Sequence, residues 1–262
     1  MSVHVDRNLQ LVDTLRDHLA RRDKALVGLW LCTGSPLVAE IAAGSGVDLL
    51  LIDMEHAPNT LPLVQSQLQA IAAYPVTTIV RVPSHDPAVI KQVLDTGAVN
   101  ILVPMIDTPE QARAAVAAVR YPPDGIRGVG SALARSGRWG RIADYVATGD
   151  QHVSVTVQIE TRQAVAHAAE IAAVDGVDAV LIGPADLAAS LGLPGQQRHP
   201  DVVAAVSTVI THVQATGTPV GINAFDPDAA QQYRDAGVAF VSASADVTIL
   251  ARGTEQLAAR WG

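Results

Sequence analysis

The sequence predicts a single (β/α)8 barrel, and three observations lead to this fold class. Short runs rich in Val, Ile and Leu alternate with alanine-rich segments of helical length along nearly all of the 262 residues. Eight such strand–helix units follow one another, and eight units in about 250 residues is the usual size of one closed barrel. The strand runs are nearly continuous in apolar residues, as expected when both faces of a parallel sheet are covered. An open, doubly wound sheet has the same alternation and is the competing arrangement.

Each element is expected at a defined place in a single domain spanning residues 1–262. Residues 1–25 form a lead-in with a helix at 8–21, where five leucine and valine residues recur at helical spacing. The strands are expected at residues 27–31, 48–52, 77–82, 100–103, 153–159, 179–182, 220–222 and 240–244. The helices are expected at residues 36–43, 61–72, 87–96, 108–119, 161–173, 201–216, 226–236 and 247–260. Four helices end at a glycine suited to a left-handed cap, namely Gly44, Gly97, Gly217 and Gly237.

The least regular stretch is residues 121–150, which contains a Tyr-Pro-Pro sequence, several glycines and four arginines. A connection of that length inside a compact domain usually serves an active site or an interface. No linker rich in Gly, Ser or Pro divides the chain. We therefore expect one domain with one long functional connection.

Composition excludes several classes of protein. Hydrophobic residues make up 49% of the chain and charged residues 17%, which is typical of a globular protein with a substantial core. The formal net charge of −8 argues against a nucleic-acid binder. The single cysteine, Cys32, excludes an intramolecular disulfide and a cysteine-rich zinc site. Residues 1–22 lack the apolar core of a signal peptide, and no apolar run reaches the ~18 residues of a membrane span, so we expect a cytoplasmic protein without membrane contact.

Polar residues follow only some of the predicted strands. The second strand ends in residues 53–56 (Asp-Met-Glu-His), the third in Arg81, and the fifth in residues 158–160 (Gln-Ile-Glu). The sixth strand runs into residues 183–186 (Gly-Pro-Ala-Asp), whereas the fourth ends in residues 103–105 (Val-Pro-Met), without a charged group. In (β/α)8 enzymes the C-terminal ends of the strands form the active site. Carboxylates, a histidine and an arginine are therefore expected at one rim.

Glu160 and Asp186 are the predicted metal ligands. Two carboxylates from consecutive strands suit Mg²⁺ or Mn²⁺, which keep several positions for water and substrate, and Co²⁺ and Zn²⁺ are alternatives. Gln158 lies two residues before Glu160, so both side chains face the same side of the strand and Gln158 can support the site from below. Taken alone, Asp186 could cap a helix and Glu160 could form a surface ion pair. Their occurrence at consecutive strand ends favours the metal.

Three further residues are candidates for catalysis. His56 is the histidine best placed to act as a base, because Asp53 could orient its imidazole ring and raise its basicity. Glu55 could serve the site or form an ion pair behind it. Arg81 ends a strand of Thr, Ile and Val, where a buried guanidinium needs an anionic partner. That partner could be a nearby carboxylate or the oxygen of a developing enolate.

The start of the helix after the sixth strand is a predicted anion site. Gly183, Pro184 and Ala185 open this helix, and proline is well tolerated in a first turn. The free N–H groups that follow could bind a substrate carboxylate beside the metal.

Five segments, in order along the chain, resemble a known family. They are residues 28–30 (Gly-Leu-Trp), 51–59 (Leu-Ile-Asp-Met-Glu-His-Ala-Pro-Asn), 121–130 (Tyr-Pro-Pro-Asp-Gly-Ile-Arg-Gly-Val-Gly), 158–161 (Gln-Ile-Glu-Thr) and 182–187 (Ile-Gly-Pro-Ala-Asp-Leu). With them, residues 28–260 resemble the HpcH/HpaI aldolase family of class II pyruvate aldolases. The chain departs from that pattern at Met54, where relatives often have glycine, and at Cys32, where a small residue is common.

The resemblance implies a role for each candidate. Glu160 and Asp186 would be the metal ligands, His56 paired with Asp53 the general base, and Arg81 the group at the enolate oxygen. The backbone at Gly183 and Ala185, with Gln158 and Trp30, would contact the substrate. The resemblance also implies a homohexamer, a dimer of trimers whose last helix packs on a neighbouring subunit, with the region around Asp95 near an adjacent site.

The implied activity is the reversible cleavage of 4-hydroxy-2-oxo acids into pyruvate and an aldehyde, as in aromatic catabolism, with hydroxypyruvate as a further donor. Lys24 and Lys91 are the only lysines and neither ends a predicted strand, so a Schiff-base mechanism is not expected. A citramalyl- or malyl-CoA-type lyase of the wider family is the first alternative, with the arginines of residues 127–141 as candidate phosphate ligands. A barrel that only binds a metabolite is the second.

Overall fold

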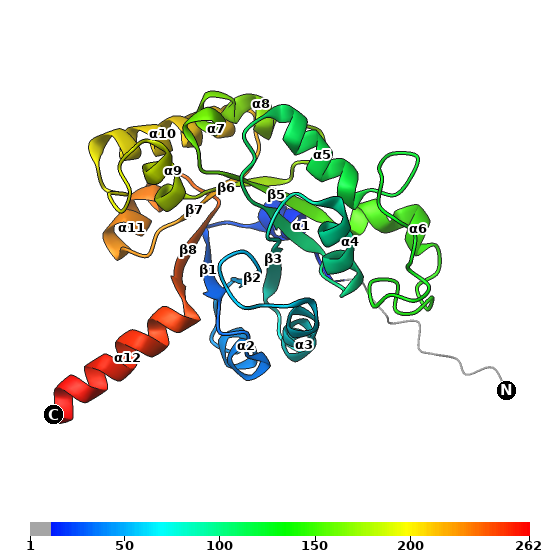
Figure 1. Ribbon diagram of the computed structural model, residues 1–262, viewed down its shortest axis with the longest axis horizontal. Coiled ribbons are helices and arrows are strands. Elements are labelled where there is room, and N and C mark those ends of the chain that lie inside the picture. Colours follow the sequence, from blue (N-terminus) through cyan, green and yellow to red (C-terminus); the bar gives the residue numbers. More distant parts are fainter. Residues whose placement is uncertain (1–11) are drawn as a thin grey trace.

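The chain forms a closed, eight-stranded parallel barrel, as the sequence predicts. The structure is a computed structural model that describes residues 12–262. Every strand pairs with the next, and β8 pairs with β1 to close the sheet, which rules out the open doubly wound arrangement (Figure 1). The strands are β1 Leu26–Leu31, β2 Leu49–Asp53, β3 Thr77–Arg81, β4 Asn100–Val103, β5 Ser154–Ile159, β6 Ala179–Ile182, β7 Val220–Asn223 and β8 Phe240–Ala245.

Helices follow the strands and surround the barrel (Figure 1). Five of the α-helices in the described part of the chain begin with a proline in the first turn after a Ser, Thr or Asp cap, a combination that favours helix initiation. Among the described residues they are α1 Leu15–Arg21, α2 Pro36–Ala43, α3 Leu61–Ile71, α4 Pro87–Asp95, α5 Pro109–Val119, α6 Tyr145–Thr148, the 3₁₀ turn η1 Gly149–His152, α7 Arg162–Ala166, α8 Ala168–Ala172, α9 Pro184–Ser190, α10 Pro200–Ala215, α11 Pro227–Asp235 and α12 Asp246–Trp261. In the described part of the chain, none of these helices is long and apolar enough to cross a membrane.

Three predicted helical features are wrong in detail. The helix expected at residues 8–21 begins only at Leu15, because Thr14 and Asp17 form a capping box, and residues 8–11 lie outside the described part. The helix expected at residues 161–173 is divided into α7 and α8 at His167, which leaves the helical conformation. Gly44 caps α2 in the right-handed region, with φ −82°, whereas the other three predicted cap glycines have positive φ.

The core has two layers, one inside the barrel and one between sheet and helices. Alternate strand residues such as Leu49, Leu51, Ile79 and Leu181 fill the interior. The intervening residues pack outward against the helices, in a larger second cluster. The side chains of Leu15 and Leu19 in α1 join the interior cluster, so this helix closes the N-terminal end of the barrel. The opposite, C-terminal end is left for the site.

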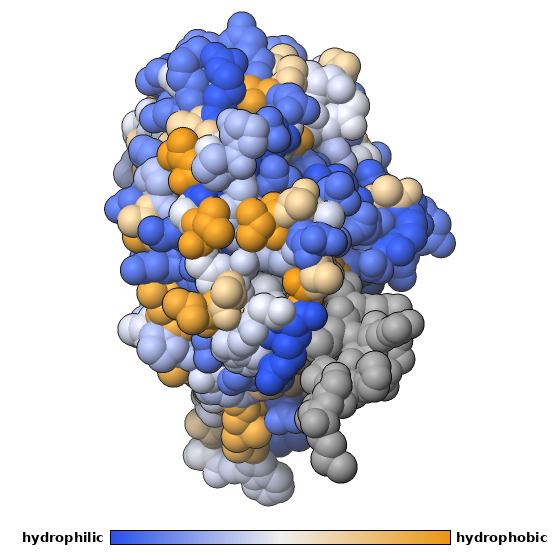
Figure 2. All heavy atoms as spheres, turned by 90° about the vertical axis from the view of Figure 1, so that its right-hand side faces the viewer, coloured by the Kyte–Doolittle hydropathy of each residue, from blue (hydrophilic) through white to orange (hydrophobic). Residues whose placement is uncertain are grey.

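The long connection at residues 121–150 is mostly irregular and contains only α6 and the start of η1. Its anchor is Arg127, whose fully buried guanidinium lies 4.6 Å from the ring of Tyr121 and 5.9 Å from that of Tyr145. Elsewhere the segment exposes apolar side chains, including Leu133 and Trp139. Figure 2 shows this side of the molecule, where orange apolar groups interrupt a largely hydrophilic surface.

Candidate active site

Strand alternation brings the predicted site residues to one rim. Leu49 and Leu51 face the barrel interior, so Asp53, two residues further, faces inward at the end of β2. The same period places Arg81 inward at the end of β3, because Ile79 is an interior residue. Asp53 and Arg81 are direct partners in the parallel register. Their side chains therefore lie side by side.

Arg81 is held by two carboxylates. Its Nε and Nη2 donate to the two oxygens of Asp53 at 2.9 and 2.8 Å, and its Nη1 lies 2.9 Å from an oxygen of Glu55. The guanidinium carbon also lies 4.4 Å from the ring centroid of Trp30, on the other side. Arg81 is only 6% exposed, so these two carboxylates satisfy a guanidinium that water barely reaches. The structural pairing that the sequence left open is therefore present.

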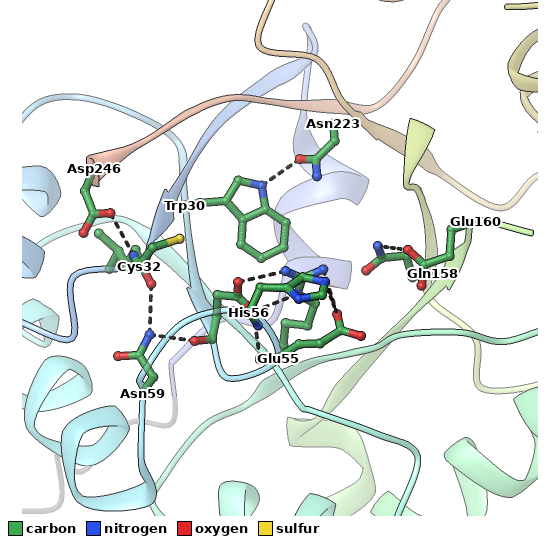
Figure 3. A network of polar contacts seen from close by, with 12 residues as sticks. Trp30, Cys32, Glu55, His56, Asn59, Gln158, Glu160, Asn223 and Asp246 are labelled. Atoms are coloured by element: carbon green, nitrogen blue, oxygen red, sulfur yellow. Dashed lines mark hydrogen bonds and ion pairs between the residues drawn. The ribbon is translucent and has the colours of Figure 1, made fainter. Parts of the chain in front are cut away.

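His56 is the exposed member of the group, and its orientation differs from the prediction. The side chain of His56 is 64% exposed, and its Nε2 lies 3.8 Å from Glu55 Oε2 (Figure 3). Asp53 contacts only the backbone N–H of His56, at 3.4 Å, because both its oxygens are bound to Arg81. The described structure therefore has no contact between the His56 ring and Asp53, and the role of this pair stays a prediction. Glu55 is the carboxylate next to the imidazole.

Glu160 is a buried carboxylate that is held from two sides. One oxygen accepts the backbone N–H of Met105 at 2.8 Å, and the other accepts the side-chain amide of Gln158 (Figure 3). Glu160 is 2% exposed. Burial raises its pKa to about 7, the hydrogen bond from Met105 works against this rise, and the neighbouring carboxylate of Asp186 adds to it. The folded protein thus contains a carboxylate whose negative charge is poorly compensated.

Gly183 allows the two metal-ligand candidates to approach each other. The pairing of Ile159 with Ile182 makes Glu160 and Gly183 the next opposing positions of β5 and β6. A Cβ added at Gly183 would lie 2.6 Å from Glu160 Oε2 and 2.9 Å from Gln158 Nε2, so any larger residue would displace these two side-chain ends. Gly183 also precedes α9, whose first turn contains Asp186.

These residues fit a divalent cation. Glu160 is buried and poorly compensated, and the Oε1 atom of Gln158 beside it is buried without a hydrogen-bond partner. No group of three or more His, Cys, Asp or Glu residues within 12–262 could hold a metal by itself. Two carboxylates would leave most positions to water and substrate, as Mg²⁺ and Mn²⁺ prefer. The donor set is therefore that of a hard cation shared with a substrate.

One cavity of about 670 Å³ unites most of the predicted residues. Its inner wall is formed by His56, Arg81, Gln158, Gly183, Ala185 and Asp186. Glu160, Asp53 and Trp30 lie behind this wall and are buried. Trp30 packs against the guanidinium of Arg81 and does not line the cavity. Its direct contact with a substrate stays a prediction. The arginines of residues 127–141 do not line the cavity.

Sequence reasoning missed three contributors. Asn223, at the end of β7, accepts the indole N–H of Trp30 at 2.6 Å and lines the cavity. The sequence did contain a signal for Asn223, because it is a polar residue at the C-terminal end of a strand. Asn59 donates to the carbonyl oxygens of Leu31 and Asp53, so it fixes the loop that presents His56. The backbone N–H of Met105, a residue in the left-handed conformation with φ 55°, donates to Glu160. A backbone donor of this kind cannot be predicted from residue type.

Comparisons with known proteins identify the family and the fold. Residues 26–252 match the family described as HpcH/HpaI aldolase/citrate lyase. The chain is 51% identical, over 236 residues and 90% of each chain, to a 4-hydroxy-2-oxo-heptane-1,7-dioate aldolase from Salmonella dublin. A solved HpcH/HpaI aldolase/citrate lyase family protein from Burkholderia cenocepacia J2315 is 45% identical with a TM-score of 0.91, covering 94% of this chain and 98% of that one. The HpcH/HpaI aldolase from Desulfitobacterium hafniense DCB-2 is 30% identical with a TM-score of 0.87, covering 95% and 96%.

Proposed function

The chain belongs to the HpcH/HpaI aldolase/citrate lyase family, and we propose that it cleaves and forms the C3–C4 bond of 4-hydroxy-2-oxo acids such as 4-hydroxy-2-oxoheptane-1,7-dioate. The products of cleavage are pyruvate and an aldehyde. The chain is a class II aldolase, a carbon–carbon lyase that depends on a divalent metal. One observation carries the proposal. His56, Arg81 and Asp186 line the same cavity, and the buried carboxylate of Glu160 lies directly behind them.

Glu160 and Asp186 are the proposed metal ligands, and Mg²⁺ or Mn²⁺ the proposed metal. A bound divalent cation would act as a Lewis acid toward the carboxylate and 2-oxo oxygens of the substrate. Gln158 and the N–H of Met105 orient the Glu160 carboxylate. The backbone at Gly183 and Ala185, at the start of α9, is the proposed site for the substrate carboxylate. Hydroxypyruvate, which has the same carboxylate and oxo groups, is a further proposed donor.

His56 is the proposed general base. In the cleavage direction its imidazole takes the proton of the C4 hydroxyl, the C3–C4 bond breaks, and the electron pair passes into the enolate of pyruvate. Protonation at C3 then yields pyruvate and the aldehyde leaves. Arg81, held by Asp53 and Glu55, faces the cavity and stabilises the negative charge that develops on the enolate oxygen. The exposed position of His56 allows its imidazole to exchange protons with solvent between deprotonation of the C4 hydroxyl and protonation at C3.

A lyase acting on CoA esters is less well supported. Such an enzyme needs basic groups for the phosphates of CoA. The predicted candidates were the arginines of residues 127–141, but Arg127 is buried against Tyr121 and Tyr145, and none of them lines the cavity. A barrel that only binds a metabolite would not need the connected arrangement of base, arginine and buried carboxylate described above.

The test is pyruvate release from 4-hydroxy-2-oxoheptane-1,7-dioate with and without EDTA. We expect release that stops when divalent ions are removed and returns with Mg²⁺ or Mn²⁺. His56→Ala should lower kcat at least about a hundredfold while Mn²⁺ binding persists, because the base is not a ligand. His212→Ala, at an exposed position of α10, is the matched control and should keep full activity. Normal turnover by His56→Ala, or by enzyme stripped of divalent ions, would refute the assignment.

A homohexamer built as a dimer of trimers is a further part of the proposal. Helix α12 extends away from the barrel (Figure 1), and only Asp246, its first residue, is buried. Its apolar side chains Ile249, Leu250 and Leu257 are each more than half exposed. An amphipathic helix of this kind suits packing on a neighbouring subunit. Sedimentation should give the mass of six chains. The cytoplasmic location and the role in aromatic catabolism stay predictions.

A further inference from the structure

The cavity extends well beyond the candidate catalytic residues. Its outer part lies between the connection from α9 to α10 and the start of α11. Val203 and Phe225 give this part an apolar wall, and the Phe225 ring is 48% exposed. Gln197, Arg198 and Asp226 provide polar groups beside that wall. The reaction proposed above uses none of these outer residues.

Within the described residues, the inner part of the cavity offers no unassigned lysine or arginine to a second carboxylate of the substrate. Four carboxylates lie at the rim, those of Asp53, Glu55, Glu160 and Asp186. In the part of the chain that the structure describes, Arg81 is the only lysine or arginine of the inner wall, and it already pairs with Asp53 and Glu55 and is assigned to the enolate oxygen. An acidic group at the far end of a substrate therefore needs another cation. Among the described residues that line the cavity, Arg198 is the only other lysine or arginine.

Arg198 is 73% exposed and pairs with the carboxylate that caps α11. Its Nη1 lies 3.2 Å from Asp226 Oδ2, while Asp226 Oδ1 accepts the backbone N–H of Ala229 at 2.9 Å and so caps α11. The carboxylate of Asp226 is thereby fixed by two partners. In the described structure, Nε and Nη2 of Arg198 make no hydrogen bond, and this side of the guanidinium has the fork geometry that binds a second carboxylate.

We propose that Arg198, positioned by Asp226, binds a carboxylate at the far end of the aldehyde half of the substrate and so determines acceptor specificity. The inference rests on the proposed aldol reaction and deepens it. The methylene groups between the aldehyde and the carboxylate lie along Val203 and Phe225. A singly charged carboxylate matches the site better than a phosphate dianion, because Asp226 already compensates part of the charge of Arg198.

The test compares two acceptor aldehydes of similar shape in the aldol direction, with pyruvate as the donor. Succinic semialdehyde ends in a carboxylate, and 4-methylpentanal replaces that carboxylate by an isopropyl group. The measured quantity is the ratio of kcat/KM for the acidic aldehyde to kcat/KM for the neutral one. In Arg198→Gln this ratio should fall about tenfold, mainly through KM for succinic semialdehyde. Arg198→Glu, which reverses the charge, should lower it further.

Arg113→Gln is the matched control, because Arg113 is an exposed arginine of α5 that pairs with Glu110 outside the cavity. The ratio should stay at the wild-type value in this variant, which excludes an effect of net charge alone. A ratio that stays within twofold of wild type in both Arg198 variants overturns the inference while leaving the aldolase intact. Failure of wild-type enzyme to add pyruvate to either aldehyde overturns the proposed function and the inference together.

Discussion

Glu160→Gln tests the electrostatic cost of the predicted metal site. In the folded protein the pKa of Glu160 lies at about 7, above its ordinary value of 4.5, chiefly because the carboxyl group is buried. Between these two values the folded chain keeps a proton that the unfolded chain has released. The contribution of Glu160 to the free energy of unfolding therefore falls as the pH rises from about 4.5 to 7. At about 1.4 kcal/mol for each pH unit, the loss is about 3 kcal/mol.

The glutamine variant lacks this titration and keeps similar contacts. Its side-chain oxygen can still accept the N–H of Met105, and the Gln158 amide can turn so that its unpartnered oxygen accepts from the new amide group. Measured in EDTA at fixed protein concentration, the free energy of unfolding of the variant relative to wild type should rise by about 3 kcal/mol between pH 4.5 and pH 8. Urea unfolding followed by circular dichroism gives the free energy of unfolding of each protein at each pH.

Added Mg²⁺ should reverse the difference. At pH 8 the cation should stabilise wild type, because it neutralises the buried carboxylate, and should have little effect on Glu160→Gln. Glu40→Gln, at an exposed position of α2, controls for loss of a carboxylate and should follow wild type. If the free energies of unfolding of wild type and Glu160→Gln changed in parallel between pH 5 and 8, Glu160 would not have the raised pKa. This result would contradict the argument that its buried, uncompensated charge favours a metal.

Three further substitutions test the geometry of the rim. Gly183→Ala should lower Mn²⁺ affinity about 10- to 100-fold in calorimetry, because the new Cβ would lie 2.6 Å from the Glu160 carboxylate and displace it. Gly253→Ala is the control and should keep the wild-type affinity, because a Cβ at that position meets nothing within 4 Å. Trp30→Phe removes the indole hydrogen bond and should lower the unfolding free energy by about 1 kcal/mol, as thermal melts would detect. Arg81→Lys cannot keep the two-point pairing with Asp53 and should reduce kcat about a hundredfold or more; an unchanged kcat would exclude it from the reaction.

The elements of the fold could be predicted because they depend on local patterns. Strands appear as apolar runs, and five of the described α-helices begin with a capping residue and a proline in the first turn, so β4 and β6 match their expected bounds and most other elements differ by one or two residues. The break at His167 has no such pattern. There the ring of His167 lies 3.1 Å from the carbonyl oxygen of Asp107, a contact between residues 60 positions apart. Tertiary contacts of this kind override helical propensity.

The site was predictable as a set of residues but not as a set of pairs. Strand alternation alone places Asp53, Arg81 and Glu160 at the same rim. Which carboxylate meets which base depends on the register between strands, and here residue 53 lies opposite residue 81. Asp53 is therefore bound to Arg81 and leaves His56 to Glu55. A backbone donor such as the N–H of Met105 has no sequence signal at all.

The observed pairing divides the rim into a fixed layer and a free group. Asp53, Arg81 and Trp30 are buried and bound to one another, so their positions do not depend on a substrate. His56 is mostly exposed and attached to this layer through its backbone N–H and through Glu55. The proposed base must release its proton to solvent in one half-reaction and take a proton from substrate in the other, and exposure to solvent favours this exchange. A group that stabilises an enolate benefits from rigidity, because no reorganisation is then needed as the charge develops. In the proposed reaction these two demands fall on different side chains, the buried Arg81 and the exposed His56.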